Sequence, residues 1–216
     1  MESILSSLAR QGLHIGIEIV ANDSIDPLAW VDFGALKLCV QKFIWDQALA
    51  QHEHGRLVLA HEIGHLAGAH PLRSGDMQNA GLRPMLLTMG LGVLAMLAGA
   101  PDAGAMRIGN SSYFGTLGAL GFSREQEGRA DQAAVGFLEK TGQSSRGLVE
   151  FFDNFRYQEV FQEARRFPYF RSHPLSSERI EMLRARVEQQ PHYNVVDSPA
   201  DMERHEIMKA KIVAFT

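Results

Sequence analysis

The chain has 216 residues, a formal net charge of −4 and a hydrophobic content of 45%. These values suit an ordinary globular protein of one domain, and the slightly acidic balance gives no electrostatic reason to expect a nucleic-acid partner. A single cysteine, Cys39, excludes an intrachain disulfide and a cysteine-based zinc site, so a bound metal must use His, Asp or Glu ligands.

The first 54 residues contain short helix and strand patterns. Residues 2–10 favour a short helix, whereas apolar side chains at alternate positions over 13–19, and more weakly over 36–40, are typical of half-buried strands. We therefore expect a small sheet of two or more strands before residue 55. The N-terminus lacks a basic stretch followed by an apolar core, so no signal peptide is visible in the sequence as given.

The stretch 57–67, LVLAHEIGHLA, predicts an apolar helix that three polar residues interrupt. His61 and His65 are four residues apart and project from one helix face, where two imidazoles can bind a single metal ion. Glu62 lies beside this face and can hold a water molecule. Buried polar groups are costly unless they are satisfied, and a zinc ion would satisfy them. The alternative is a helix whose histidines make core hydrogen bonds.

An uncharged stretch follows from Pro84 to Pro101. It is shorter than the roughly 20 residues that a membrane-spanning helix needs. We expect a buried helix or hairpin that covers the candidate site, and the alternative is reversible association of residues 84–101 with a membrane surface. Residues 102–121 are rich in Gly, Ala and Ser, which predicts a flexible connection that could act as a lid.

A second polar helix is predicted to begin with Ser123 as its N-cap and Gln126 as the capping partner. Glu127 and Asp131 are four residues apart and share a face that continues through apolar positions, so both carboxylates point inward. An inward carboxylate pair needs a partner, and a metal ion on the histidine pair is the obvious one. Further helices are predicted over 148–161, 176–189 and 200–214.

Three strings of residues together resemble the motifs of one enzyme family. They are VLAHEIGH at 58–65, FSREQEGRAD at 122–131 and SHPLSSERIEMLRARVE at 172–188. They are similar to the M48 family of zinc metallopeptidases, within the gluzincin group. The resemblance covers roughly residues 55–190 and is closest to bacterial envelope members that carry TPR repeats after the peptidase domain. No such repeats are visible here, so the chain resembles the peptidase module alone.

The resemblance implies an α+β, predominantly α fold of the zincin-like (gluzincin) type, with the HExxH motif on the active-site helix. The chain would form one peptidase domain over 1–216. Within it, residues 1–54 would hold the N-terminal sheet, 55–190 the catalytic core and 191–216 a C-terminal tail and helix. By analogy with the family, the periplasm or a membrane face is the expected location.

The resemblance also implies a role for each matching polar residue. One zinc ion per chain would be bound by His61, His65 and Glu127. Glu62 would be the general base, and Asp131 would fix the orientation of a histidine ligand. His173 matches a loop histidine that either faces the transition state or reaches the zinc and blocks it.

This ligand set predicts a zinc metalloendopeptidase that acts on extended or misfolded protein or peptide substrates. Three protein ligands leave zinc one position for water, which is typical of a catalytic site. Zinc lowers the pKa of that water to about 7, and Glu62 takes its proton during attack on the peptide carbonyl. His173 is the candidate donor to the oxyanion. The alternatives are a self-inhibited or inactive M48-like binding or chaperone module with His173 plugging the zinc, and a structural protein without metal.

Overall fold

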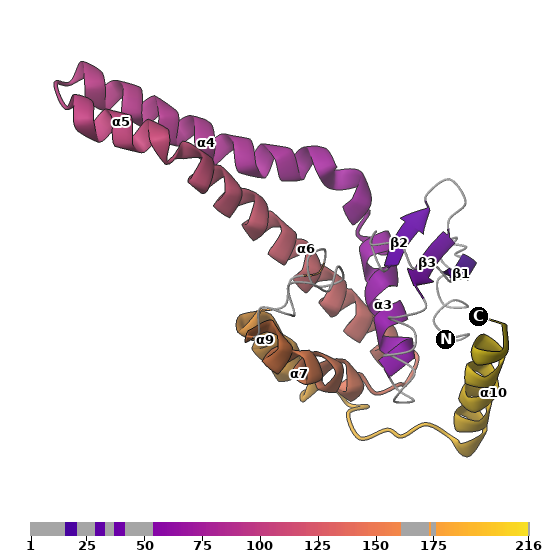
Figure 1. Ribbon diagram of the computed structural model, residues 1–216. Coiled ribbons are helices and arrows are strands. Elements are labelled where there is room, and N and C mark those ends of the chain that lie inside the picture. Colours follow the sequence, from indigo (N-terminus) through magenta and orange to yellow (C-terminus); the bar gives the residue numbers. More distant parts are fainter. Residues whose placement is uncertain are drawn as a thin grey trace. The chain divides into compact units, whose positions relative to one another are not determined.

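The computed structural model describes residues 16–20, 29–32, 37–41, 54–160, 173 and 176–215. This part of the chain is mostly helical, which confirms the predominantly α class (Figure 1). The chain divides into two compact units, of which the second is Gly68–Glu127 and the first is formed by the residues on either side of it. The division falls within helix α6, directly after Glu127. A single peptidase domain over 1–216 stays a prediction.

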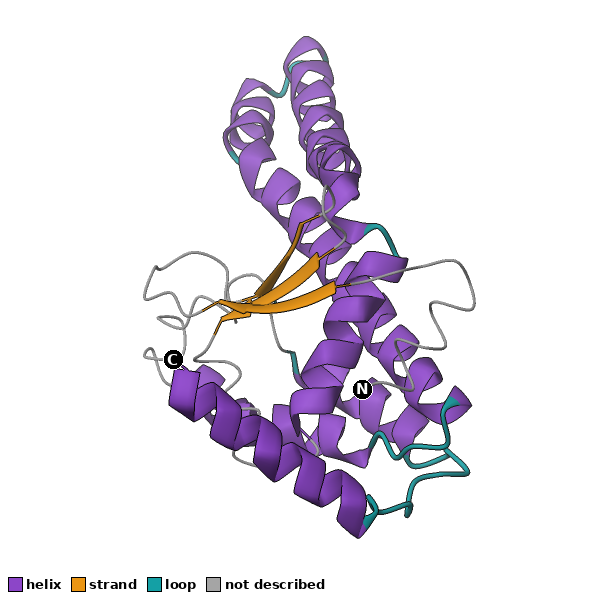
Figure 2. Cartoon of the chain, turned by 90° about the vertical axis from the view of Figure 1, so that its right-hand side faces the viewer, coloured by secondary structure: helices purple, strands orange, loops and turns teal. Residues whose placement is uncertain are grey.

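Three short strands in the first unit form one sheet (Figure 2). They are β1 (Gly16–Val20), β2 (Ala29–Asp32) and β3 (Lys37–Gln41). The central strand β3 is parallel to β1 and antiparallel to β2. The predicted strands over 13–19 and 36–40 overlap β1 and β3, whereas the predicted helix over 2–10 lies outside the described residues.

The core of the first unit surrounds α3 (His54–Ala67), which is the predicted HExxH helix. Helix α7 (Arg146–Val160) packs against α3 and against α9 (Ser177–Val187). The C-terminal part of α6 (Ser111–Lys140) approaches α3 closely, because Gly64 lies against the backbone of Ala130. The most deeply buried large side chains come from these four helices and are Leu57, Leu59, Ile63, Leu138, Leu148, Phe151, Phe152 and Ile180.

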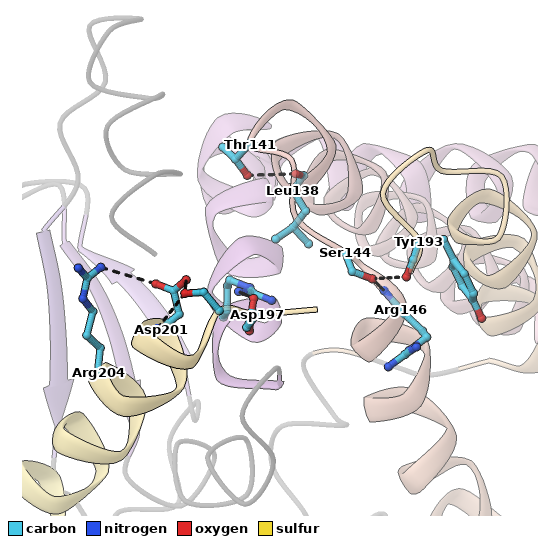
Figure 3. Close-up of polar contacts among 10 residues, drawn as sticks. Leu138, Thr141, Ser144, Arg146, Tyr193, Asp197, Asp201 and Arg204 are labelled. Atoms are coloured by element: carbon cyan, nitrogen blue, oxygen red, sulfur yellow. Dashed lines mark hydrogen bonds and ion pairs between the residues drawn. The ribbon is translucent and has the colours of Figure 1, made fainter. Parts of the chain in front are cut away.

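The segment after α9 is attached to the same unit by polar contacts, several of which Figure 3 shows. Arg56 Nη1 donates to Asp197 Oδ1 at 2.7 Å. Ser144 Oγ donates to the carbonyl oxygen of Tyr193 at 2.8 Å and accepts a hydrogen bond from the backbone N–H of Arg146 at 3.2 Å. The predicted polar tail therefore folds back on the helical core before α10 (Pro199–Phe215) begins.

The second unit begins with a short 3₁₀ turn, η1 (His70–Arg73), and continues as a helical hairpin. Helix α4 (Ser74–Leu97) leads to a turn, and α5 (Pro101–Gly109) and the first part of α6 return beside it (Figure 1). The hairpin form agrees with one of the expected structures for residues 84–101. The expectation that this stretch is buried is wrong, because most of its large apolar side chains are exposed.

Two further predictions in this region are also wrong. Residues 102–121 form α5 and the start of α6, not a flexible connection. The predicted N-cap Ser123 lies inside α6, which begins at Ser111. The reason is that Gly115 and Gly118, which alone favour a loop, lie where α6 touches the backbone of α4, and a helical neighbour offsets the cost of glycine.

Candidate metal centre

Helix α3 buries three of its polar residues, His61, Glu62 and His65, in the interior. The two Nε2 atoms of the histidines lie 3.1 Å apart, and their rings meet edge to face with centroids separated by 4.7 Å. Two nitrogen ligands on one tetrahedral zinc ion would lie roughly 3.3 Å apart, given Zn–N bonds of about 2.0–2.1 Å. The histidine pair therefore has the separation that binding of a single ion requires.

Two more potential ligands converge on the same point from other parts of the chain. Glu127 on α6 and His173 before α9 each offer one ligand atom, and these two atoms and those of His61 and His65 all lie within 4.8 Å of one another. All four side chains are buried. Such a set of two or three imidazoles and a carboxylate is typical of a zinc site.

The carboxylate of Glu62 lies beside this group. Its Oε1 atom is 3.8 Å from His173 Nε2, too far for a hydrogen bond. Within the described part of the chain, this buried oxygen has no hydrogen-bond partner. An unsatisfied buried carboxylate oxygen is costly, and a water molecule next to a metal ion would supply the missing donor. The chemistry of the residues present thus fits a metal ion with a bound water.

Asp131 contacts the ring nitrogen of His61 opposite the one that lies beside His65. Its Oδ1 lies 2.9 Å from His61 Nδ1. Burial raises the pKa of Asp131. The Arg179 guanidinium and the hydrogen bonds from Arg179 and His61 together lower the pKa by more than burial raises it, so it lies below its usual value. An ionised carboxylate only accepts hydrogen bonds, so Nδ1 of His61 carries the proton and Nε2 keeps its lone pair for a metal.

Arg179, in the first turn of α9, holds Asp131 in turn. Its Nε donates to Asp131 Oδ2 at 2.5 Å and its Nη2 to Asp131 Oδ1 at 2.8 Å. The guanidinium also lies over the ring of Phe152, 4.8 Å from the centroid. Arg179 lies within the string at 172–188, but a lone arginine in a helical stretch carries no signal that identifies its partner.

Gly64 is a second residue whose importance the sequence did not indicate. A Cβ atom at this position would lie 2.6 Å from the carbonyl oxygen of Ala130, closer than van der Waals contact allows. The residue inside the HEIGH motif therefore permits α3 to reach the part of α6 that carries Asp131.

The structure thus brings together every residue that the sequence analysis named for the site. His61, His65, Glu127 and His173 form the potential ligand group, Glu62 lies at its edge and Asp131 stands behind His61. Their roles as ligands, base and orienting residue stay predictions.

Comparisons with known proteins agree on one family. The family model for peptidase family M48 matches residues 34–187. The chain is 32% identical over 139 residues to the putative beta-barrel assembly-enhancing protease of Vibrio cholerae, an alignment that covers 62% of this chain and 27% of that protein. It is 31% identical over 137 residues to the metalloprotease LoiP of Escherichia coli, covering 60% of this chain and 48% of that protein. This chain spans less than half the length of these relatives. No solved structure matches significantly.

Proposed function

Because this chain belongs to peptidase family M48, we propose that it is a zinc-dependent endopeptidase that hydrolyses peptide bonds of extended or misfolded proteins. The observation that carries the proposal is the buried convergence of His61, His65 and Glu127 beside the unpaired carboxylate oxygen of Glu62. A structural metal site has no need of a second carboxylate without a hydrogen-bond partner at its edge, whereas hydrolysis needs a base there.

In the proposed mechanism, His61, His65 and Glu127 would hold one zinc ion. When bound, the ion would supply acidification of a water molecule, to a pKa of about 7, and polarisation of the substrate carbonyl. Asp131 keeps the Nδ1 proton of His61 in place, so that Nε2 faces the ion. The burial of all these side chains excludes bulk water and strengthens their electrostatic interactions.

Glu62 would move the proton. Its carboxylate accepts a proton from the attacking water and returns it to the nitrogen of the leaving amine. His173 would donate a hydrogen bond to the oxyanion that forms on the substrate carbonyl. An extended substrate suits this site, because zincin-like enzymes hold the peptide along an edge strand, and here β1 and β2 are the edges of the sheet.

The test is metal content and cleavage of casein by the wild type and by Glu62→Gln. We expect about one zinc ion per chain in both proteins, and a rate that falls by about 10²–10⁴ in the variant, because only the base is removed. The matched control is Glu125→Gln, which removes an exposed carboxylate two residues before Glu127. It should keep the wild-type rate.

Equal cleavage by wild type and Glu62→Gln would refute the proposed base. Zinc without cleavage in either protein would favour the alternative of a self-inhibited or inactive binding module. A protein that binds no zinc would remove the basis of the whole proposal.

The role of His173 has a separate test. We expect His173→Ala to retain zinc, because three ligands remain, and to cleave casein more slowly by about 10²–10³ through loss of the oxyanion donor. Zinc content and steady-state cleavage measure the two effects. A faster variant would instead identify His173 as a plug that occupies the fourth position of the metal.

A further inference from the structure

The outer surface of the α4–α6 hairpin, defined here as residues 74–123, is mostly apolar, and its charged residues are Asp76, Arg83, Asp102 and Arg107. Its exposed side chains include Leu86, Leu87, Leu94 and Leu97 on α4 and Phe114 and Leu117 on α6, and Leu97 is 80% exposed. Within the described residues, α4 is the one helix long and apolar enough to cross a membrane. A core helix of a soluble protein can have the same composition, but only 6% of the most apolar part of α4 is buried.

On the inner surface of the hairpin, the closest contacts between the helices are at small residues. A Cβ at Gly92 would lie 2.8 Å from the carbonyl oxygen of Gly104, and one at Gly104 would lie 2.5 Å from that of Gly92. Further toward the base, Gly81 and Gly115 approach each other in the same reciprocal way at 3.1 Å. Close backbone contact through small residues, with large apolar side chains outside, is typical of helices that pack within lipid.

The distribution of charge agrees with this arrangement. Charged residues make up 21% of the chain, yet between Pro84 and Ser123 the only ones are Asp102 and Arg107, both on α5. The uncharged part of α4 from Pro84 to Leu97 is about 20 Å long, at 1.5 Å per residue. It is long enough to enter the hydrocarbon layer.

We propose that this hairpin embeds the apolar faces of α4 and α6 in a lipid bilayer. A protein partner would be expected to offer charged groups to a polar rim, whereas residues 84–97 on α4 and 111–123 on α6 include no charged residue that could pair with such groups. Contact with lipid hydrocarbon requires no charged group on either face. The bilayer would cover the exposed leucines that the chain itself leaves in contact with water.

The test is flotation of the full chain with vesicles of phosphatidylcholine and phosphatidylglycerol in a density gradient. The hairpin variant combines Leu87→Glu with Leu94→Glu. The control variant combines Met182→Glu on α9 with Ile207→Glu on α10, which are exposed to a similar degree outside the hairpin. We expect the wild type and the control to float with the vesicles. The lipid-bound fraction of the hairpin variant should fall on the order of tenfold or more, because carboxylates are strongly excluded from hydrocarbon.

Two companion measurements make the result unambiguous. Circular dichroism should show equal helix content in all three proteins, and sedimentation without lipid should give the same mass for each. A wild type that stays out of the vesicles, or a hairpin variant that floats equally well, would overturn the proposal. Self-association of the wild type without lipid, lost in the hairpin variant and without flotation, would assign the surface to a second copy instead. Glu62→Gln should float like the wild type, so a failure of the proposed peptidase activity would not affect this result.

Discussion

His61, Asp131 and Arg179 form a buried chain of hydrogen bonds that begins at the potential metal ligands and ends on α9. Asp131 accepts hydrogen bonds from both of its neighbours, His61 and Arg179. The Asp131 carboxylate would be an uncompensated buried charge without Arg179, and His61 would be free to rotate without Asp131. Replacing a single residue of this hydrogen-bond network should therefore affect both the stability of the protein and the orientation of a metal ligand.

We expect Arg179→Ala to destabilise the protein by about 3–5 kcal/mol, because it leaves the buried Asp131 carboxylate unpaired. Zinc affinity should also fall, by about tenfold to a hundredfold, since His61 loses its fixed orientation. Chemical denaturation and competition with a zinc chelator measure these two effects. Arg179→Lys should restore only part of the affinity, because an ammonium group cannot form both hydrogen bonds in the planar geometry of the guanidinium.

The matched control is Arg184→Ala, five residues later on the same helix. Arg184 Nη2 also pairs with an aspartate, Asp153, at 2.6 Å, but both side chains are 35% exposed. Exposed ion pairs contribute about 0–1 kcal/mol, so stability and zinc affinity should stay close to the wild type. If Arg184→Ala lost as much stability and zinc affinity as Arg179→Ala, any arginine on α9 would have this effect. The buried hydrogen bonds of Arg179 would then have no special role.

At the scale of elements, the site depends on the close approach of α3 and α6. The two helices meet where Gly64 touches the backbone of Ala130, one residue before Asp131. Helices normally pack with axes 8–10 Å apart, and small residues at the crossing allow the shorter distances. The spacing of these two helices sets the distance between the α3 ligands and the carboxylates of α6.

We expect Gly64→Ala to lower stability by about 1–3 kcal/mol, because the new methyl group forces the helices apart. The zinc affinity should fall with it. Thermal or chemical denaturation and a chelator titration are the measurements. Gly136→Ala on α6 is the control: a Cβ there meets no described residue within 4 Å, so the substitution should be neutral or stabilising by about 0.5–1 kcal/mol. A Gly64→Ala protein as stable as the wild type would mean that the helices tolerate a wider spacing.

At the scale of the whole molecule, metal binding and folding should be coupled. Residues from α3 and α6, together with His173, converge on one buried point, so the complete ligand group exists only in the folded chain. A ligand that binds only the folded state stabilises it by mass action. Among the described residues, the apo protein would keep the buried Oε1 of Glu62 without a hydrogen-bond partner.

Removal of metal with a chelator should therefore lower the midpoint of thermal unfolding, and zinc should restore it. Free zinc at a hundred times its Kd should add about 2.7 kcal/mol to the free energy of unfolding. Differential scanning calorimetry on the chelated and reloaded protein measures the shift. His65→Ala should unfold at a midpoint that depends much less on zinc, and an equal dependence in wild type and variant would argue against this site.

The sequence by itself determined the features that depend on local spacing. His61 and His65 share a face because helix geometry places residues four apart above one another, and the same rule pairs Glu127 with Asp131. The strings around these residues were sufficient to identify the family. The predominantly helical class was implied by the same family resemblance.

Which distant groups meet became visible only in the folded structure. No local pattern shows that Arg179 is the partner of Asp131, that Gly64 allows α3 to touch α6, or that Gly115 and Gly118 continue a helix beside α4. It also reversed the expectation that residues 84–101 are buried, because an apolar helix has the same sequence whether protein or lipid covers it. Spacing along the chain encodes the faces of each helix, whereas the neighbour of each face depends on contacts between residues far apart in the sequence.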